Sequence, residues 1–139
     1  ILDADGSIFE KSNLNLFNNS SSEVIVFTKV KHENLPSHVT LITPKEFSIK
    51  EILSEIAKLG IQSIYVEGGP SIHDQFLASG YWDEVITYIS PILLGGNNTS
   101  SFTSNRITSE KIQLNNTKIT KLGEDIRISG RRVSQCLQD

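Results

Sequence analysis

The stretch from residue 61 to residue 79 constrains the fold more than any other part of this chain. Residues 61–66, Ile-Gln-Ser-Ile-Tyr-Val, have the composition of a short buried strand. Glu-Gly-Gly-Pro follows directly at residues 67–70, and residues 72–79 have a helical pattern. A strand that runs through a glycine turn into a helix is typical of α/β proteins, which bind ligands at the carboxyl ends of their strands.

The glycine turn has the features of an anion site. Gly68 and Gly69 carry no side chains, so a ligand can approach the backbone closely. Pro70 suits the first turn of a helix, because its missing N–H would have no partner there. The other N–H groups of that turn and the helix dipole favour an anion such as phosphate. The plain alternative is a tight turn next to a solvated acid, since the dinucleotide and P-loop patterns are absent.

The composition of the chain is that of an ordinary globular protein. Its 139 residues are enough for one domain with a core, and 37% of them are hydrophobic and 21% charged. A net charge of −3 argues against a nucleic-acid partner. No apolar run is close to the roughly 18 residues of a membrane helix, and no signal peptide is visible. We therefore expect a cytoplasmic protein without a membrane partner.

Metal and disulfide chemistry are not expected. Cys136 is the only cysteine, so no internal disulfide can form. The three histidines, at positions 32, 38 and 73, stand apart, and no Cys/His cluster has metal-ligand spacing. We predict no metal site, and the spacing of residues assigns no catalytic residue.

Two short strands and a loop are expected in the first part of the chain. The apolar runs at residues 24–28 and 39–42 have the composition of strands. Residues 4–22 are rich in asparagine and serine and predict a loop, in which Leu14 and Leu16 form one short extended contact.

An amphipathic helix is expected to follow these strands. Ser48 is the predicted N-cap, Glu51 completes a capping box, and Gly60 ends the helix at C′. Apolar side chains at intervals of three and four residues form one face: Ile49, Ile52, Leu53, Ile56 and Leu59. With the strand at 61–66 behind it, this helix predicts a β-α-β unit with a parallel strand pair.

The C-terminal part predicts antiparallel strands. Residues 82–92 suit one strand, and the alternating residues between 107 and 132 suit a hairpin with its turn at 123–125. Residues 97–105 predict a polar loop. The expected fold class is therefore α/β, with a mixed sheet that is parallel in the middle and antiparallel at its C-terminal end.

Several short motifs, in this order, resemble a known family. They are Glu67-Gly68-Gly69-Pro70, Phe76-Leu77, Trp82-Asp83-Glu84 and Pro91-Ile92-Leu93-Leu94-Gly95. Together with the hairpin sequence at 123–130, they resemble the C-terminal reductase domain of the bacterial riboflavin-biosynthesis deaminase-reductase. That domain is similar in fold to dihydrofolate reductase, with helices on the faces of its mixed sheet. The resemblance covers nearly the whole chain.

The resemblance implies an NADPH-dependent oxidoreductase. Its substrate would be a pyrimidine ribosyl phosphate, 5-amino-6-(5-phosphoribosylamino)uracil, which is reduced to the ribitylamino product. Glu67 resembles the substrate-contacting glutamate of the family. The segment that resembles the cofactor-binding backbone comprises Gly68, Gly69, Pro70, Ser71, Ile72, His73, Asp74 and Gln75.

The resemblance also implies what surrounds this chain. The chain has no methionine and begins in an apolar pair, so we expect a piece of a longer protein. Residues 1–132 would be a reductase domain without its N-terminal strand and loops, and residues 133–139 a tail. A zinc deaminase domain is expected upstream, and the fragment alone is expected to show no turnover.

The long hairpin predicts a homodimer. Arg131 and Arg132, near the end of the chain, are expected to be solvated charges.

Two other functions are compatible with the same residues. One is a non-catalytic nucleotide-binding or dimerisation module that kept this fold without the chemistry. The other is a reductase of this fold that acts on a pteridine-like substrate. The residues of this chain alone do not choose the exact substrate.

Overall fold

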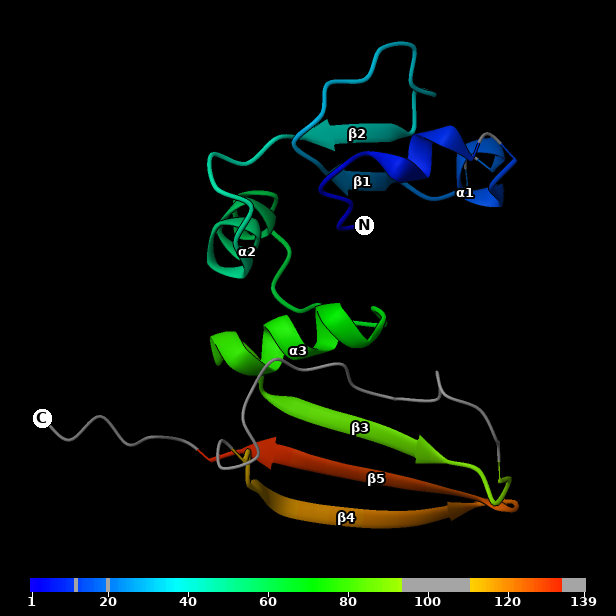
Figure 1. Ribbon diagram of the computed structural model, residues 1–139, viewed down its shortest axis with the longest axis vertical. Helices are drawn as coiled ribbons and strands as arrows, with labels where there is room; N and C mark the ends of the chain where they lie inside the picture. Colours follow the sequence, from blue (N-terminus) through cyan, green and yellow to red (C-terminus); the bar gives the residue numbers. More distant parts are fainter. Residues whose placement is uncertain (12, 20, 94–110, 134–139) are drawn as a thin grey trace, which may run out of the picture. The chain divides into compact units, whose positions relative to one another are not determined.

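The protein, seen in a computed structural model, forms two units, Ile1–Ile64 and Tyr65–Asp139, which are described separately below (Figure 1). The structure describes residues 1–11, 13–19, 21–93 and 111–133. The boundary between the units falls inside the stretch that the sequence predicts as a central strand.

A short parallel sheet forms the base of the first unit. Strand β1 (Val24–Phe27) pairs with strand β2 (Val39–Ile42) over all four residues of each (Figure 1). Leu2 forms an isolated parallel bridge with Phe27, so the start of the chain lies beside β1. Both strands predicted in this part of the chain are confirmed. The parallel direction places their carboxyl ends at one edge of the sheet.

Helix α2 (Ile49–Lys58) begins and ends where the sequence predicts. The Ser48 hydroxyl accepts a hydrogen bond from the Glu51 N–H at 3.3 Å, which caps the first turn. Gly60 follows the helix with φ 78°, a left-handed conformation that closes the C-terminus. The buried apolar side chains of this unit are Val26, Phe27, Val39, Ile49 and Ile52.

The loop before β1 is more regular than predicted. Ser7–Glu10 forms a 3-10 turn, η1, and Asn15–Asn18 forms the short helix α1. The predicted extended contact of Leu14 and Leu16 is wrong, because backbone hydrogen bonds wind residues 14–19 into a helical turn instead. An isolated leucine pair in a polar segment does not distinguish a turn of helix from an extended strand.

The stretch 61–66 is not a strand in the structure, and this prediction is wrong. Ile61, Ile64 and Tyr65 are 40%, 42% and 67% exposed. An extended segment becomes a strand only when its N–H and C=O groups pair with a neighbour. No described residue pairs with this stretch. The predicted β-α-β unit around α2 therefore does not form, and the parallel and antiparallel strands make two separate sheets.

The second unit contains a three-stranded antiparallel sheet. Its strands are β3 (Glu84–Ile89), β4 (Leu114–Leu122) and β5 (Asp125–Arg132), and β5 lies between the other two (Figure 1). Gly123, with φ 63°, and Glu124 form the two-residue turn between β4 and β5. The predicted C-terminal hairpin is confirmed, and it is the longest strand pairing among the described residues.

Some predictions fall on residues that the structure does not describe. They are the polar loop at 97–105 and Cys136. Among the described residues, no helix is long and apolar enough to cross a membrane. Within the same residues, no group of three or more His, Cys, Asp or Glu side chains could hold a metal ion.

Candidate functional site

Helix α3 (Pro70–Ser79) begins at the glycine turn, as predicted. Gly69 is the N-cap, and its carbonyl accepts hydrogen bonds from the N–H groups of Ile72 and His73 at 3.0 and 3.1 Å. Pro70 occupies the first helical position. No side chain caps this helix and no acidic residue lies in its first turn. The first turn itself therefore carries no carboxylate, and its positive dipole end suits an anion.

Glycine occupies positions 68 and 69 of the turn for different structural reasons. A Cβ on Gly68 would lie 2.6 Å from Cβ of Ile72, so the packing of the turn on the helix requires glycine there. Among the described residues, a Cβ on Gly69 would meet nothing within 4 Å. The φ of Gly69 is −67°, which any residue adopts. Neither packing against the described residues nor backbone conformation explains Gly69, and no described atom fills the space beside it.

The predicted cofactor-binding side chains of α3 do not all point the same way. Ser71 and Gln75 are exposed and lie one turn apart, with Gln75 Nε2 donating to the Ser71 hydroxyl at 3.4 Å. Ile72 is half-buried against Gly68, and His73 and Asp74 are also half-buried. Successive helical residues are rotated by roughly 100°, so one ligand at the turn cannot contact all of these side chains. The backbone of the first turn and Ser71 are the groups that the structure brings together.

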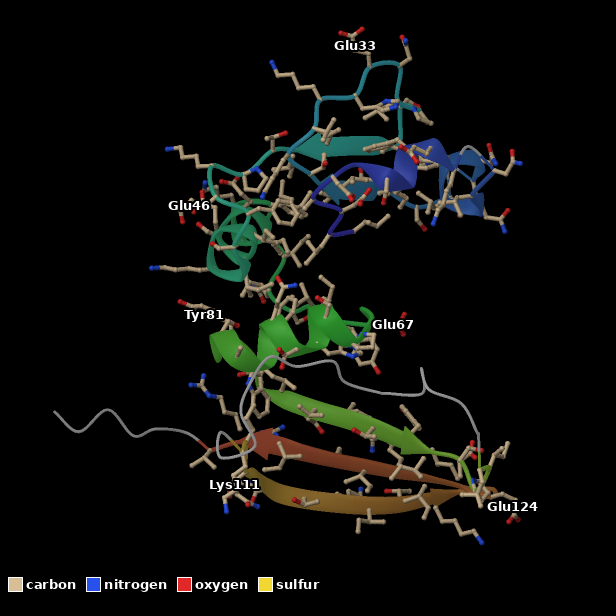
Figure 2. All side chains as sticks on the ribbon, viewed as in Figure 1. Glu33, Glu46, Glu67, Tyr81, Lys111 and Glu124 are labelled. Carbon is tan, nitrogen blue, oxygen red and sulfur yellow. The ribbon has the colours of Figure 1, made fainter. Side chains whose placement is uncertain are left out.

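Glu67 lies directly before the turn and is exposed. Figure 2 shows its side chain beside the start of α3. Because the stretch before it is not a strand, Glu67 ends an extended segment rather than a strand of a sheet. Its carboxylate is therefore close in sequence and in space to the open backbone of the glycine turn, as the predicted site requires.

One contact at the other end of α3 is absent from the sequence prediction. The Arg132 guanidinium is not simply solvated, because Nη1 donates a hydrogen bond to the Gly80 carbonyl, where α3 ends. Arg131, which is exposed, lies opposite Glu84 in the ladder of β3 and β5. The two residues joined by the Arg132 contact are 52 positions apart in the chain. No local sequence pattern connects residues at that separation.

Comparison with protein families places nearly the whole chain in one domain. The family model described as the RibD C-terminal domain matches residues 2–128. The riboflavin biosynthesis protein RibD of Bacillus amyloliquefaciens is 40% identical over 84 residues, which cover 58% of this chain and 23% of that protein. The chain spans between 15% and 34% of the length of these curated relatives.

Solved structures agree with this match at the level of the fold. Acinetobacter baumannii RibD superimposes with a TM-score of 0.80 at 23% identity, over 96% of this chain and 37% of that chain. A Thermotoga maritima protein superimposes with a TM-score of 0.72 at 24% identity, over 96% and 37%. It is described as a diaminohydroxyphosphoribosylaminopyrimidine deaminase and 5-amino-6-(5-phosphoribosylamino)uracil reductase. The predicted dihydrofolate-reductase-like fold class is confirmed.

Proposed function

This chain belongs to the RibD C-terminal domain family, and from that membership we propose that it is the reductase part of an enzyme of riboflavin biosynthesis. The proposed substrate is 5-amino-6-(5-phosphoribosylamino)uracil, the compound named for the Thermotoga maritima protein. The family match over residues 2–128 is the observation that carries the proposal.

The proposed reaction is a hydride transfer to the sugar of the substrate. Hydride adds to the sugar carbon that bears the amino nitrogen, the bond from this carbon to the ring oxygen breaks, and the ring oxygen takes up a proton. The product is the open-chain ribitylamino compound. NADPH, when bound, supplies the hydride, and the protein contributes binding and orientation. We assign no side chain of this chain as the proton donor.

The start of α3 fits a phosphate group of NADPH. Gly69 leaves its backbone accessible, since a Cβ there would meet no described atom within 4 Å. The helix start has neither a capping side chain nor an acid in its first turn. Backbone N–H groups and the positive end of the dipole remain to attract a phosphate. In this proposal Ser71 adds a hydroxyl contact, and Ile72 contributes only its backbone because its side chain packs on Gly68.

Glu67 is the proposed contact to the substrate. Its carboxylate is exposed beside the cofactor turn, where it can accept hydrogen bonds from hydroxyl or amine groups. Such a position next to the cofactor orients the sugar carbon towards the hydride donor. Orientation of this kind accelerates a reaction without a covalent role for the side chain.

Other features of the whole protein are also part of the proposal. They are a cytoplasmic location, a homodimeric assembly, a zinc deaminase domain upstream in the full-length protein, and a division into a reductase domain at 1–132 and a tail at 133–139. The absence of turnover by residues 1–139 alone stays a prediction. The Thermotoga maritima protein is a deaminase as well as a reductase, which supports the upstream domain.

Titration of NADPH into the full-length protein tests the cofactor site. Gly69→Val should weaken NADPH binding by about tenfold or more, because a branched side chain would occupy the open space that the phosphate needs. The melting temperature should fall only slightly: valine is a poorer N-cap residue than glycine, but φ at Gly69 is −67° and no described atom lies near the new Cβ.

Gly68→Ala tests the packing of the turn, and its main effect should be on stability. Its new Cβ would lie 2.6 Å from Ile72, so we expect a lower melting temperature from overpacking. Equal NADPH affinity in Gly69→Val and the wild type would overturn the assignment of the cofactor to this turn. Failure of the wild type to bind NADPH would overturn the reductase proposal itself.

Turnover assays separate the alternatives. Oxidation of NADPH with the ribosylamino-pyrimidine phosphate, and none with a dihydropteridine, supports the proposed substrate. Oxidation only with the pteridine supports the pteridine-reductase alternative. NADPH binding without turnover on either compound supports a non-catalytic nucleotide-binding module.

A further inference from the structure

The end of α3 is joined to the end of β5 at two points. The Arg132 guanidinium donates to the Gly80 carbonyl at the C-terminus of the helix. The backbone N–H of Arg132 donates to the Asp83 carbonyl at 3.0 Å. Gly80 and Asp83 flank the short connection from α3 to β3, so one residue of β5 holds both ends of that connection.

The charge of Arg132 complements the end of α3. The last turn of α3 contains no basic residue, whereas the last turn of α2 contains Lys58. Helix C-terminal carbonyls carry partial negative charge, and a nearby cation stabilises them. Arg132, from another element, supplies this cation, and its bond to a carbonyl is charge-assisted.

Gly80 provides the room for this contact. A Cβ on Gly80 would lie 3.0 Å from Nη2 of Arg132, closer than the guanidinium tolerates without moving. Its φ of 73° also lies in the left-handed region, where glycine is favoured. The helix end and the arginine are therefore fitted to each other in both conformation and space.

Few side chains of α3 are fully buried. Phe76, at 6% exposed, is the one buried side chain of this helix. A helix of ten residues is rigid and roughly 15 Å long. A small change of direction at its Gly80 end therefore moves the Gly69 end, where the cofactor turn is proposed.

From these contacts we infer that Arg132 is a positioning residue, which fixes α3 at its C-terminal end and thereby sets the place of the cofactor turn at its N-terminal end. The link to the cofactor rests on the proposed function, whereas the anchoring of α3 does not. Loss of the contact should increase the KM for NADPH and leave kcat at saturating NADPH unchanged, because Arg132 touches no reacting atom.

The test compares three variants of the full-length protein. Arg132→Gln removes the charge, and Arg132→Lys keeps a charged donor for the Gly80 carbonyl. Arg131→Gln is the matched control, because Arg131 is adjacent, exposed and opposite Glu84, on the other face of the sheet. Hydrogen exchange of the backbone amides at residues 74–79 reports directly on α3, and steady-state kinetics reports on NADPH.

In Arg132→Gln, we expect exchange in α3 and the KM for NADPH to increase by about two- to fivefold, because Arg132 is exposed and water weakens its charge-assisted hydrogen bond. Arg131→Gln should match the wild type, and Arg132→Lys should restore most of both values. Wild-type exchange in Arg132→Gln would overturn the inference. A lysine variant as impaired as the glutamine variant would overturn the role of the charged donor. If Arg132→Gln does not fold, Arg132→Lys is compared with the wild type instead, and a large increase of exchange in α3 of the lysine variant would overturn the same role.

Faster exchange with an unchanged KM would show that α3 is anchored but that the cofactor turn does not depend on it, which overturns the positioning role. If the wild type does not bind NADPH, the proposed function fails. The hydrogen-exchange comparison still decides whether Arg132 anchors the helix.

Discussion

Because Glu67 is exposed, substituting it can separate an effect on ligand binding from an effect on folding. Its side chain is exposed and precedes α3 rather than sitting in the core. Exposed substitutions away from caps and special backbone conformations change stability by at most about 0.5 kcal/mol. A large effect of changing Glu67 would therefore report on a ligand and not on folding.

We predict that Glu67→Gln reduces kcat/KM of the full-length enzyme by about ten- to a hundredfold. Hydrogen bonds to a charged group contribute roughly 1.5–3 kcal/mol, and their loss in the transition state appears directly in kcat/KM. The melting temperature and NADPH affinity should remain close to those of the wild type. Steady-state kinetics with varied substrate, together with calorimetry, makes these measurements.

Glu124→Gln is the control, since Glu124 is an exposed acid in the turn of the hairpin. It should leave kcat/KM unchanged. Full activity of Glu67→Gln would show that Glu67 is a surface acid without a role in substrate binding. A large fall in its melting temperature would instead identify a structural residue.

At the scale of elements, the N-cap of α2 can be tested by mutation. We predict that Ser48→Ala lowers the free energy of unfolding by about 1 kcal/mol, because the hydroxyl that accepts from the Glu51 N–H is lost. Ser54→Ala on the same helix should be neutral or slightly stabilising, because Ser54 is exposed and alanine has the higher helix propensity. Urea denaturation of both variants measures the difference. Equal destabilisation by the two would contradict the capping role.

The elements that the sequence predicts correctly depend on neighbouring residues. The Ser48 cap and Gly60 bound α2, the glycine turn and Gly80 bound α3, and a two-residue turn closes the hairpin. In each case the signal lies within a few positions of the feature it produces. The start of the candidate site was predictable for the same reason.

The features that could not be predicted depend on distant partners. The stretch 61–66 has the composition of a strand, but strand formation requires a paired neighbour, and no described residue supplies one. The direction of each side chain on α3 depends on what packs against the helix, which is why Ile72 lies against Gly68 and not towards a ligand. The contact from Arg132 to Gly80 likewise joins residues 52 positions apart.

At the scale of the whole molecule, four isoleucines lie together on one face of the antiparallel sheet, where Lys121, opposite Ile126, is the charged neighbour. Ile89 lies directly opposite Ile126, and Ile119 lies directly opposite Ile128, so all four are on the same face. Ile119, Ile89 and Ile126 are 70%, 47% and 40% exposed. Apolar side chains gathered on one exposed sheet face are typical of a surface that another protein covers.

The edge of this sheet is less suited to association than its face. β4 is an edge strand, and it carries Lys118 and Lys121. Lysines on an edge strand oppose its pairing with a second copy, because the like charges would be brought together. We therefore expect the proposed homodimer to form through the isoleucine face and not by extension of the sheet at β4.

Ile119→Lys tests this surface in the full-length protein. Burial of a lysine without a partner is unfavourable, so the dissociation constant of the dimer should rise by about tenfold or more. A Val at this position keeps the face apolar, and Ile119→Val should remain dimeric. Sedimentation velocity across a range of concentrations measures both variants and the wild type. A monomeric wild type would overturn the homodimer. A dimer that Ile119→Lys leaves intact would place the contact on another surface, because burying an unpaired lysine in the interface would weaken association.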